Sequence, residues 1–464
     1  MKKQPLLAIS AVFALTLPWL VTGIIQEVSG LSTVIVVGMT GLAIVGASFM
    51  LAWGAETAEK DVPRAFAIAI LAILAVAPEY AVDAYYAWNA GANGATAQAC
   101  GQLSGSAIAN AEPGTLAQAC HDANLAVANM TGANRILIGL GWSGIALYTI
   151  YRATRSGDSS VVQRPGSLTD AVKIDRNISL EITFLLAATV YAFFIPLGSG
   201  IGIGDTLILV GLYVLYIGVI IRNDVEEDTA HVGVPAYLQS FSKGARVAAV
   251  FGLFAYSGYM IFEAVHPFAH GLETLGTSFG IPEFFMIQWI APLASESPEL
   301  IVVLYLVNKA RSTAGFNALI SSKLNQWTLL IGTLAVVYSI ASGSVGTLAF
   351  DEKQAAEIWI TAAQSFFALG VLVNFEIDVR EALTLLVLFA SQVVLEFGVL
   401  QLVSEPTAAS LSLTLLHAYT VVYVLLGGWL FIRRRENVRR LTGRTVATVR
   451  DAFTGGTDSS EHGY

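Results

Sequence analysis

Apolar residues occur along this chain in continuous runs of about 20, the length an α-helix needs to cross a bilayer. The strands of a membrane barrel would instead alternate apolar and polar residues. A helix also satisfies its own backbone hydrogen bonds in lipid. The pattern therefore predicts an all-α, polytopic membrane protein with about 12 transmembrane helices. We place these helices at residues 5–25, 31–55, 66–90, 123–151, 178–197, 203–221, 245–265, 284–308, 313–342, 355–375, 381–403 and 409–432.

Composition supports a membrane protein. Of the 464 residues, 55% are hydrophobic and 13% are charged, whereas soluble domains carry roughly 25% charged residues. We expect the lipid bilayer to be one partner. No basic block suggests nucleic acid, and no zinc-ligand cluster or phosphate-binding Gly-rich loop with its Lys-Ser/Thr occurs. We therefore expect neither an enzyme nor a cofactor. The first apolar run is predicted to be a retained helix, with a cleaved signal peptide as the alternative.

The basic residues predict the orientation in the membrane. With the N-terminus in the cytoplasm, all but three of the 25 Lys and Arg residues fall on the inner side. Lys353 falls outside, and Arg135 and Lys323 fall within spans. The protein is therefore predicted to lie in the plasma membrane, with both termini in the cytoplasm. The tail after the last span is polar, and we expect it to be mobile.

The only two cysteines, Cys100 and Cys120, both follow the third predicted span. This loop lies outside in the predicted topology, where disulfides can form. A Cys100–Cys120 bridge is the favoured interpretation, and two free thiols are the alternative.

Buried carboxylates are the strongest functional signal, because a charge at the bilayer centre costs about 2.5–3.5 kcal/mol on insertion scales. The third span reads LAILAVAPEYAVDAYYAW and contains Glu79 and Asp83. The eighth reads WIAPLASESPELIVVLYLV and contains Glu296 and Glu299. Acids three or four residues apart share one face of a helix. Each acid could instead pair with a nearby base, but two similar motifs in separate halves favour a shared function.

Both motifs contain a Pro-Glu pair in the middle of an apolar helix. Proline lacks an N–H and clashes with the carbonyl one turn earlier, so the helix must bend or open. The freed carbonyls and the adjacent carboxylate form an oxygen-rich site. Hard cations such as Ca2+ prefer oxygen ligands. The motifs therefore predict a cation site in each half of the chain.

The spans after the two motifs also match. ANLAVANMTGANRILIGLGW follows the first motif and AGFNALISSKLNQWTLLIGTLA follows the second. Spans two to six and seven to eleven then form two five-helix repeats, and the odd number inverts one relative to the other. Inverted repeats with broken helices are typical of secondary transporters. The predicted segments are an extra N-terminal helix (1–30), two inverted repeats (31–225 and 226–405), an extra C-terminal helix (406–435) and a cytoplasmic tail (436–464).

These paired motifs resemble the alpha-repeats of the cation/calcium antiporter superfamily, the sodium/calcium exchanger-like membrane proteins. Residues 74–79 and 294–299 occupy the family's G-T-S-x-P-E pattern. Residues 128–134 and 317–323 occupy its G-N-x-x-G-S-N pattern. The resemblance covers residues 31–403. It implies that Glu79 and Glu299 are the central ion ligands, with further oxygens from Ser295, Ser322, Asn129 and Asn134.

The chain departs from the family pattern in several positions. Ala75 and Val76 replace the hydroxyl pair of the first motif, and Lys323 replaces the last Asn of the second repeat. Arg135 directly follows Asn134. The sequence gains acids at Asp83 and Glu296, which we include among the ion-binding candidates.

We expect both bases, Arg135 and Lys323, to face the site and compensate its charge, because a base facing lipid would be costly. A fixed ammonium can occupy the place of a bound cation, and a buried lysine can lose its proton. Lys323 is therefore a candidate to replace one transported ion or to carry a proton.

The predicted function is a secondary active cation antiporter. It would move Na+ or Ca2+ in exchange for Na+ or H+ by alternating access. The alternatives are a Na+/H+ or other cation/proton exchanger in which Lys323 replaces an ion, an uncoupled channel on the same scaffold, and a non-transporting membrane sensor or scaffold. The sequence does not name the ion or the oligomeric state.

Overall fold

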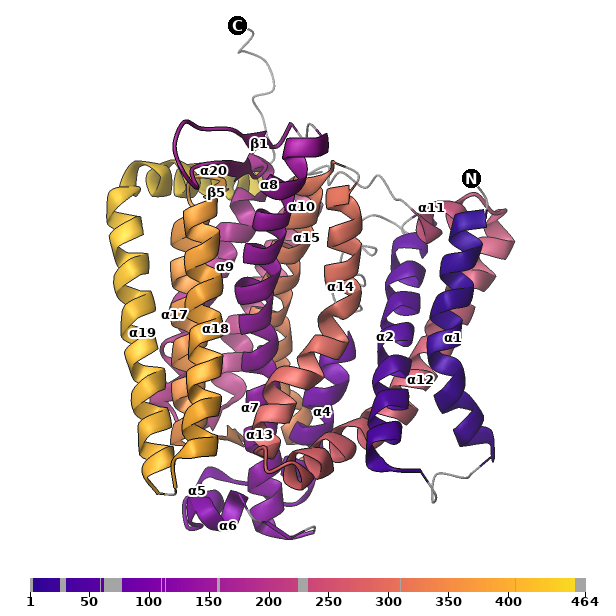
Figure 1. The fold of residues 1–464 in the computed structure, drawn as a ribbon, viewed down its shortest axis with the longest axis vertical. Coiled ribbons are helices and arrows are strands. Elements are labelled where there is room, and N and C mark those ends of the chain that lie inside the picture. The colour runs from indigo at the N-terminus through magenta and orange to yellow at the C-terminus, as the bar shows by residue number, and fades with distance from the viewer. Residues whose placement is uncertain are drawn as a thin grey trace, which may run out of the picture.

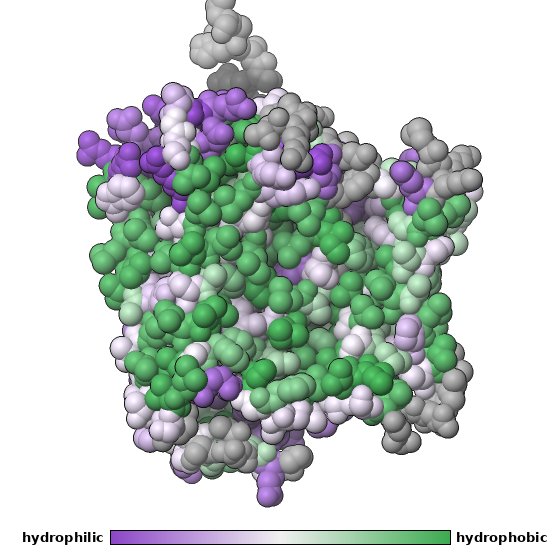
Figure 2. Space-filling model, in the orientation of Figure 1, coloured by the Kyte–Doolittle hydropathy of each residue, from purple (hydrophilic) through white to green (hydrophobic). Residues whose placement is uncertain are grey.

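The structure is a computed structural model. It describes residues 3–25, 31–58, 60–61, 77–109, 111–112, 114–156, 159–223, 233–308, 310–404 and 406–454. Most of them form helices that run between two ends of the molecule (Figure 1). On the face shown in Figure 2, hydrophobic residues form a broad band across the middle, and hydrophilic residues gather at one end, where β1 and α20 lie. This distribution is the one expected of a protein whose middle faces lipid.

The helices have the following bounds: α1 (Lys3–Ile25), α2 (Thr33–Ala58), α4 (Ala77–Ala92), α5 (Ala97–Cys100), α6 (Gly105–Ala109), α7 (Leu116–Ile136), α8 (Ser143–Ser156), α9 (Ser179–Ala192), α10 (Ile203–Asn223), α11 (Val234–Gln239), α12 (Lys243–Ser278), α13 (Glu283–Phe285), α14 (Ala291–Asn308), α15 (Ser312–Asn325), α16 (Ile331–Ser342), α17 (Glu352–Leu372), α18 (Val379–Leu402), α19 (Thr407–Arg433) and α20 (Arg435–Thr454). Three π-helical segments join consecutive helices, at Leu137–Trp142, Met286–Ile290 and Gln326–Leu330.

Short strands connect the helix ends. β1 (Val161–Val162), β2 (Ala171–Lys173) and β5 (Glu376–Asp378) form an antiparallel sheet in that order, with Val172 opposite Ile377. β3 (Gly200–Ile201) pairs with β4 (Leu348–Ala349). These pairings tie the two halves of the chain together at both ends of the helices.

Ten of the predicted spans correspond to single helical stretches that are long and apolar enough to cross a membrane. The eighth corresponds to a broken pair, Glu283–Ser297 and Glu299–Asn308, bent by 51°. This bend lies at the second Pro-Glu motif, where the sequence predicts one. The third span is described only from Ala77 onward, so its first half, with residues 74–76 of the first motif, lies outside the described residues.

One helix is longer than the pattern predicts. α12 continues to Ser278, past the expected end at residue 265, and contains Pro267. Proline removes one backbone hydrogen bond, but Phe268, Ala269 and Leu272 on the following turns are buried. Their packing stabilises the extension. α12 lies along α2, with α1 beside them, at one side of the molecule (Figure 1).

The expectation of a mobile tail is wrong for its first part. α20 forms a helix that lies across the ends of the spans (Figure 1) and packs against α9 and α10. Leu441 is fully buried and Val438 is partly buried against the core, whereas Arg439, Arg440 and Arg444 are exposed. The tail is polar on average, so its composition does not reveal this narrow apolar stripe.

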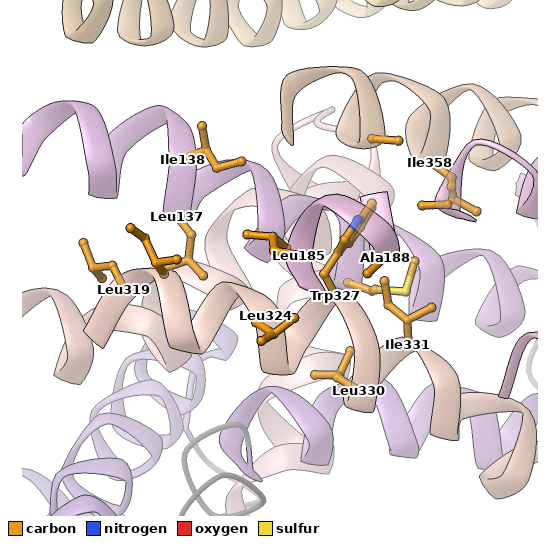
Figure 3. Close-up of a cluster of buried hydrophobic side chains, with 14 of the residues drawn as sticks. Leu137, Ile138, Leu185, Ala188, Leu319, Leu324, Trp327, Leu330, Ile331 and Ile358 are labelled. Atoms are coloured by element: carbon orange, nitrogen blue, oxygen red, sulfur yellow. The ribbon is translucent and has the colours of Figure 1, made fainter. Parts of the chain in front are cut away.

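The largest hydrophobic cluster lies between helices of both halves. Figure 3 shows Trp327 with Leu185 and Ala188 of α9 and with Leu330 and Ile331, which follow it in the chain. Trp327 is completely buried. Dense packing of this kind has low compressibility. The cluster therefore restricts movement of the neighbouring residues Lys323 and Gln326.

Cys100 and Cys120 are joined by a disulfide, with Cα atoms 5.7 Å apart. The bridge ties α5 to the beginning of α7. It lies at the opposite end of the molecule from α20 (Figure 1).

The junction between α2 and α12 contains an ion pair with a testable pH dependence. Arg246 donates two hydrogen bonds to Asp61, just beyond α2, and one to the carbonyl of Phe241 at 2.8 Å. The hydrogen bond and positive charge of Arg246 lower the pKa of Asp61.

We expect Asp61→Asn to lower the thermal stability of the purified protein at neutral pH. The folded-state pKa lies below the unfolded one, so the stabilisation is complete above about pH 4 and is lost as the pH falls through the lowered pKa. Melting temperatures of both proteins should therefore converge in acid. The exposed Asp451 is the matched control. An equal difference at every pH would contradict a role for the charge.

Candidate functional site

The predicted site residues lie on four helices, α4, α7, α14 and α15. The first three contact one another, and α15 packs against α14 and reaches α7 through Lys323. α4 and α7 come from the first half of the chain, and α14 and α15 come from the second. The contact between α7 and the Met286–Ile290 segment is especially close, since a Cβ atom on Gly132 would lie 1.8 Å from the carbonyl oxygen of Gln288. Only glycine fits here. The two halves therefore approach each other backbone to backbone beside the site.

The structure brings together carboxylates from both halves. Glu79 interacts electrostatically with Glu299 and Asp83, and Glu296 interacts with Glu79 and Glu299. Glu79 is 3% exposed, and Asp83 and Glu296 are completely buried. Like charges that interact in a low dielectric repel each other strongly. Protons or a cation must offset this repulsion.

Neighbouring side chains orient the carboxylates. Asn129 donates to Asp83 Oδ1 at 2.7 Å, and Ser322 donates to Glu299 Oε1 at 3.1 Å. Gln326 donates to Glu296 Oε1. Gln326, at the start of the π-helical segment that follows α15, is not among the predicted site residues.

Several oxygens in this group remain available to a ligand. Among the described residues, Glu79 Oε2, Asp83 Oδ2, Glu296 Oε2 and Asn129 Oδ1 are buried and accept no hydrogen bond. Buried polar atoms normally have partners. Such oxygens suit a hard cation, or a proton on the carboxylates. Ser295 lies near Glu79, and its hydroxyl donates to the Pro292 carbonyl at 3.3 Å.

Lys323 lies beside this group and is completely buried. Its Nζ donates to the main-chain oxygen of Asn134 at 3.0 Å and to Asn134 Oδ1 at 2.7 Å, and it interacts electrostatically with Glu296. It also lies 4.5 Å from the Trp327 ring centroid, a cation–π distance. The predicted charge compensation by Lys323 therefore has a geometric basis. Asn134, predicted as an ion ligand, instead has its amide oxygen engaged by Lys323.

Arg135 requires a correction. We expected it to face the four acids, but its guanidinium forms an ion pair with Glu357 of α17, donates to Gln392 of α18 and lies 4.7 Å from the Trp289 ring centroid. Sequence reasoning missed Glu357. A buried acid in the tenth span was the available signal, but no Pro-Glu motif or family pattern marked it.

Within the part of the chain that the structure describes, no three His, Cys, Asp or Glu residues form a ready metal cluster. Oxygen ligands from amides, hydroxyls and carbonyls would have to complete a cation shell.

The fold and these buried carboxylates define a polytopic membrane transport protein. The sequence profile of the family described as sodium/calcium exchanger protein matches residues 115–222 and 249–398, more than half of the chain. The chain therefore belongs to the sodium/calcium exchanger family, a family of transporters, and it is a cation antiporter of that family.

Solved structures agree with this assignment. The chain is similar to a structure described as the H+/Ca2+ exchanger CAX, with 38% identity, a TM-score of 0.79 and coverage of 97% of this chain and 99% of that one. It shares its fold with the Ca2+/H+ antiporter protein YfkE, at 12% identity and a TM-score of 0.54, over 84% of this chain and 99% of that one. No curated protein sequence matches the chain.

Proposed function

We propose that this protein exchanges Ca2+ for H+ across the membrane by alternating access, at the carboxylates between α4, α7, α14 and α15. Glu79 and Glu299 would bind the cation, and Asp83, Glu296, Ser295, Ser322 and Asn129 would supply or orient further oxygens. Protons would occupy the carboxylates on the return.

The observation that carries this proposal is the charge of the site. Arg135 is paired with Glu357, so among the described residues Lys323 is the base that lies beside these four acids, and it interacts with Glu296. The formal sum is −4 + 1 = −3 when all four acids are ionised. Three uncompensated charges inside a bilayer are very costly. The site must therefore hold either protons or a cation, and exchange between them follows from competition for the same oxygens.

The similarity to the H+/Ca2+ exchanger CAX, at 38% identity over nearly the whole chain, supports the choice of ions. A specific observation keeps Na+/H+ exchange as a second candidate. The ammonium of Lys323 is fixed by Asn134 at 2.7 and 3.0 Å, and it would occupy the place of one bound cation.

The organisation proposed from the sequence fits this mechanism. Residues 31–225 and 226–405 would be inverted repeats whose broken helices meet at the site. α1 and α19 would be additions to this ten-helix core. The arginine-rich α20 and the beginning of α1 lie at the same end of the molecule (Figure 1), which we assign to the cytoplasmic side of the plasma membrane.

Reconstituted protein tests the proposal. Proteoliposomes with an imposed pH gradient should take up 45Ca2+ and release protons, measured with a trapped pH dye. Na+, K+ and Mg2+ in place of Ca2+ separate the two candidates. Proton release driven by Na+ alone would select Na+/H+ exchange. Ion flow without any counterflow would indicate a channel, and the absence of both would indicate a sensor or scaffold.

A further inference from the structure

A second group of buried ionisable residues lies on the other side of α7. It consists of Arg135 on α7, Glu357 on α17 and Glu396 on α18, all at most 1% exposed. Burial of charge in a bilayer is costly and commonly marks function. Neither the cation site nor the family pattern accounts for this group.

The group is held together by polar contacts across four helices. Arg135 pairs with Glu357 and donates to Gln392, and Gln392 donates to Glu396 Oε2 at 2.7 Å. Ser412 of α19 donates to Glu396 Oε1 at 3.3 Å. The two carboxylates are also close enough to repel each other. They therefore behave as one electrostatic unit.

The buried part of this unit contains more acids than bases. Two acids and one base are fully buried, so their sum is −1 when all are ionised. Lys353 Nζ lies 3.5 Å from Glu396 Oε1, but its side chain is 25% exposed. Lys353 lies in the first turn of α17, near α13. Among the described residues, Tyr423 of α19 also interacts with Arg135. The ion pair with Lys353 brings the sum to zero. When the partly exposed Lys353 is released to solvent, one proton shared by Glu357 and Glu396 would neutralise the buried part.

Glu357 also has an oxygen on which a proton could reside. Among the described residues, Glu357 Oε1 and the amide atoms of Gln288 are buried without a hydrogen bond of good geometry, although the Gln288 side chain lies close enough to interact with this carboxylate. These atoms are fully buried. Atoms of this kind are the polar partners that a water molecule needs in a buried site.

The unit is connected to the cation site through one turn of α7. Lys323 donates a hydrogen bond to Asn134, and Glu357 forms an ion pair with the next residue, Arg135. Protonation of Glu357 would weaken its attraction to Arg135. Because Asn134 and Arg135 are consecutive, a shift of Arg135 would act on the contact between Asn134 and Lys323.

We propose that Glu357 and Glu396 form a second, proton-binding site, separate from the cation site and loaded from the end of the molecule where Lys353 lies. This inference rests on the proposed function. Its occupancy by a proton, transmitted through Arg135 and Asn134, sets how strongly cation movement is coupled to protons.

The test compares two modes of transport in proteoliposomes. Exchange of 45Ca2+ for unlabelled Ca2+ at equal pH requires no net proton movement, whereas uptake driven by a pH gradient does. In Glu357→Gln and Glu396→Gln we expect Ca2+/Ca2+ exchange to remain and proton-driven uptake to fall roughly tenfold, within the range typical of coupled sites. The pH profile of uptake should flatten. Glu352→Gln, an exposed acid on the same helix, should leave both modes unchanged.

A structural ion pair predicts something else. If Glu357 only holds helices together, Glu357→Gln should lower both modes equally, and the charge-neutral double variant Arg135→Gln/Glu357→Gln should restore them. Either that result or unchanged proton coupling in both single variants would overturn the inference while leaving the proposed function intact. Wild-type protein that shows no proton-coupled Ca2+ uptake would overturn the proposed function itself.

Discussion

Glu79→Gln and Glu299→Gln should each abolish cation transport in proteoliposomes. Each substitution keeps nearly the same shape but replaces a charged cation ligand by a neutral amide. Loss of one charged ligand in a low-dielectric site is expected to cost at least 2 kcal/mol, or about 30-fold in affinity. We expect flux near that of empty liposomes at the Ca2+ concentration that half-saturates the wild-type protein.

The same two variants should lose stabilisation of the purified protein by Ca2+. A ligand that binds only the folded state raises its apparent stability by mass action. Thermal unfolding with and without Ca2+ measures this directly, with Glu352→Gln as the matched control on an exposed position. Retained flux and retained stabilisation in both variants would show that the cation binds elsewhere.

Lys323→Asn should change the ion selectivity or the coupling of transport. The substitution takes the formal charge of the site from −3 to −4 and removes the ammonium that Asn134 and Glu296 now share. The asparagine also matches the residue expected at this position of the family pattern. We expect an added cation, Na+, to bind there, so that Ca2+ flux becomes dependent on Na+ concentration.

Lys323→Met separates charge from ligand supply, because it removes the ammonium without adding an oxygen. We expect it to weaken proton coupling without creating Na+ dependence. Lys243→Asn, an exposed lysine at the start of α12, is the control for a nonspecific loss of positive charge. Identical selectivity in wild type and in Lys323→Asn would remove any role of this lysine in ion choice.

The sequence predicted the membrane-spanning helices well because hydropathy is a local property. A bilayer demands about 20 apolar residues per helix whatever the neighbours are. Boundaries depended on packing, and they were less accurate. α12 extends past Pro267 because its following turns are buried, and α20 forms because its narrow stripe packs on α9 and α10.

The candidate site was predicted in part for the same reason. A carboxylate in an apolar run is visible without any structure, so Glu79, Asp83, Glu296 and Glu299 stood out. The sequence does not show the direction in which a side chain points. Lys323 turned toward the acids, whereas Arg135 turned toward Glu357 in a helix more than 200 positions away.

The sequence by itself determined the class of protein, the solvent that surrounds it and the residues too costly to be there without a purpose. All of these follow from the free energy of single groups in lipid. Only the tertiary structure decided which charges share a site. The electrostatic energy of a pair depends on the distance between residues that the chain brings together from its two halves, and that distance is set by the packing of whole helices.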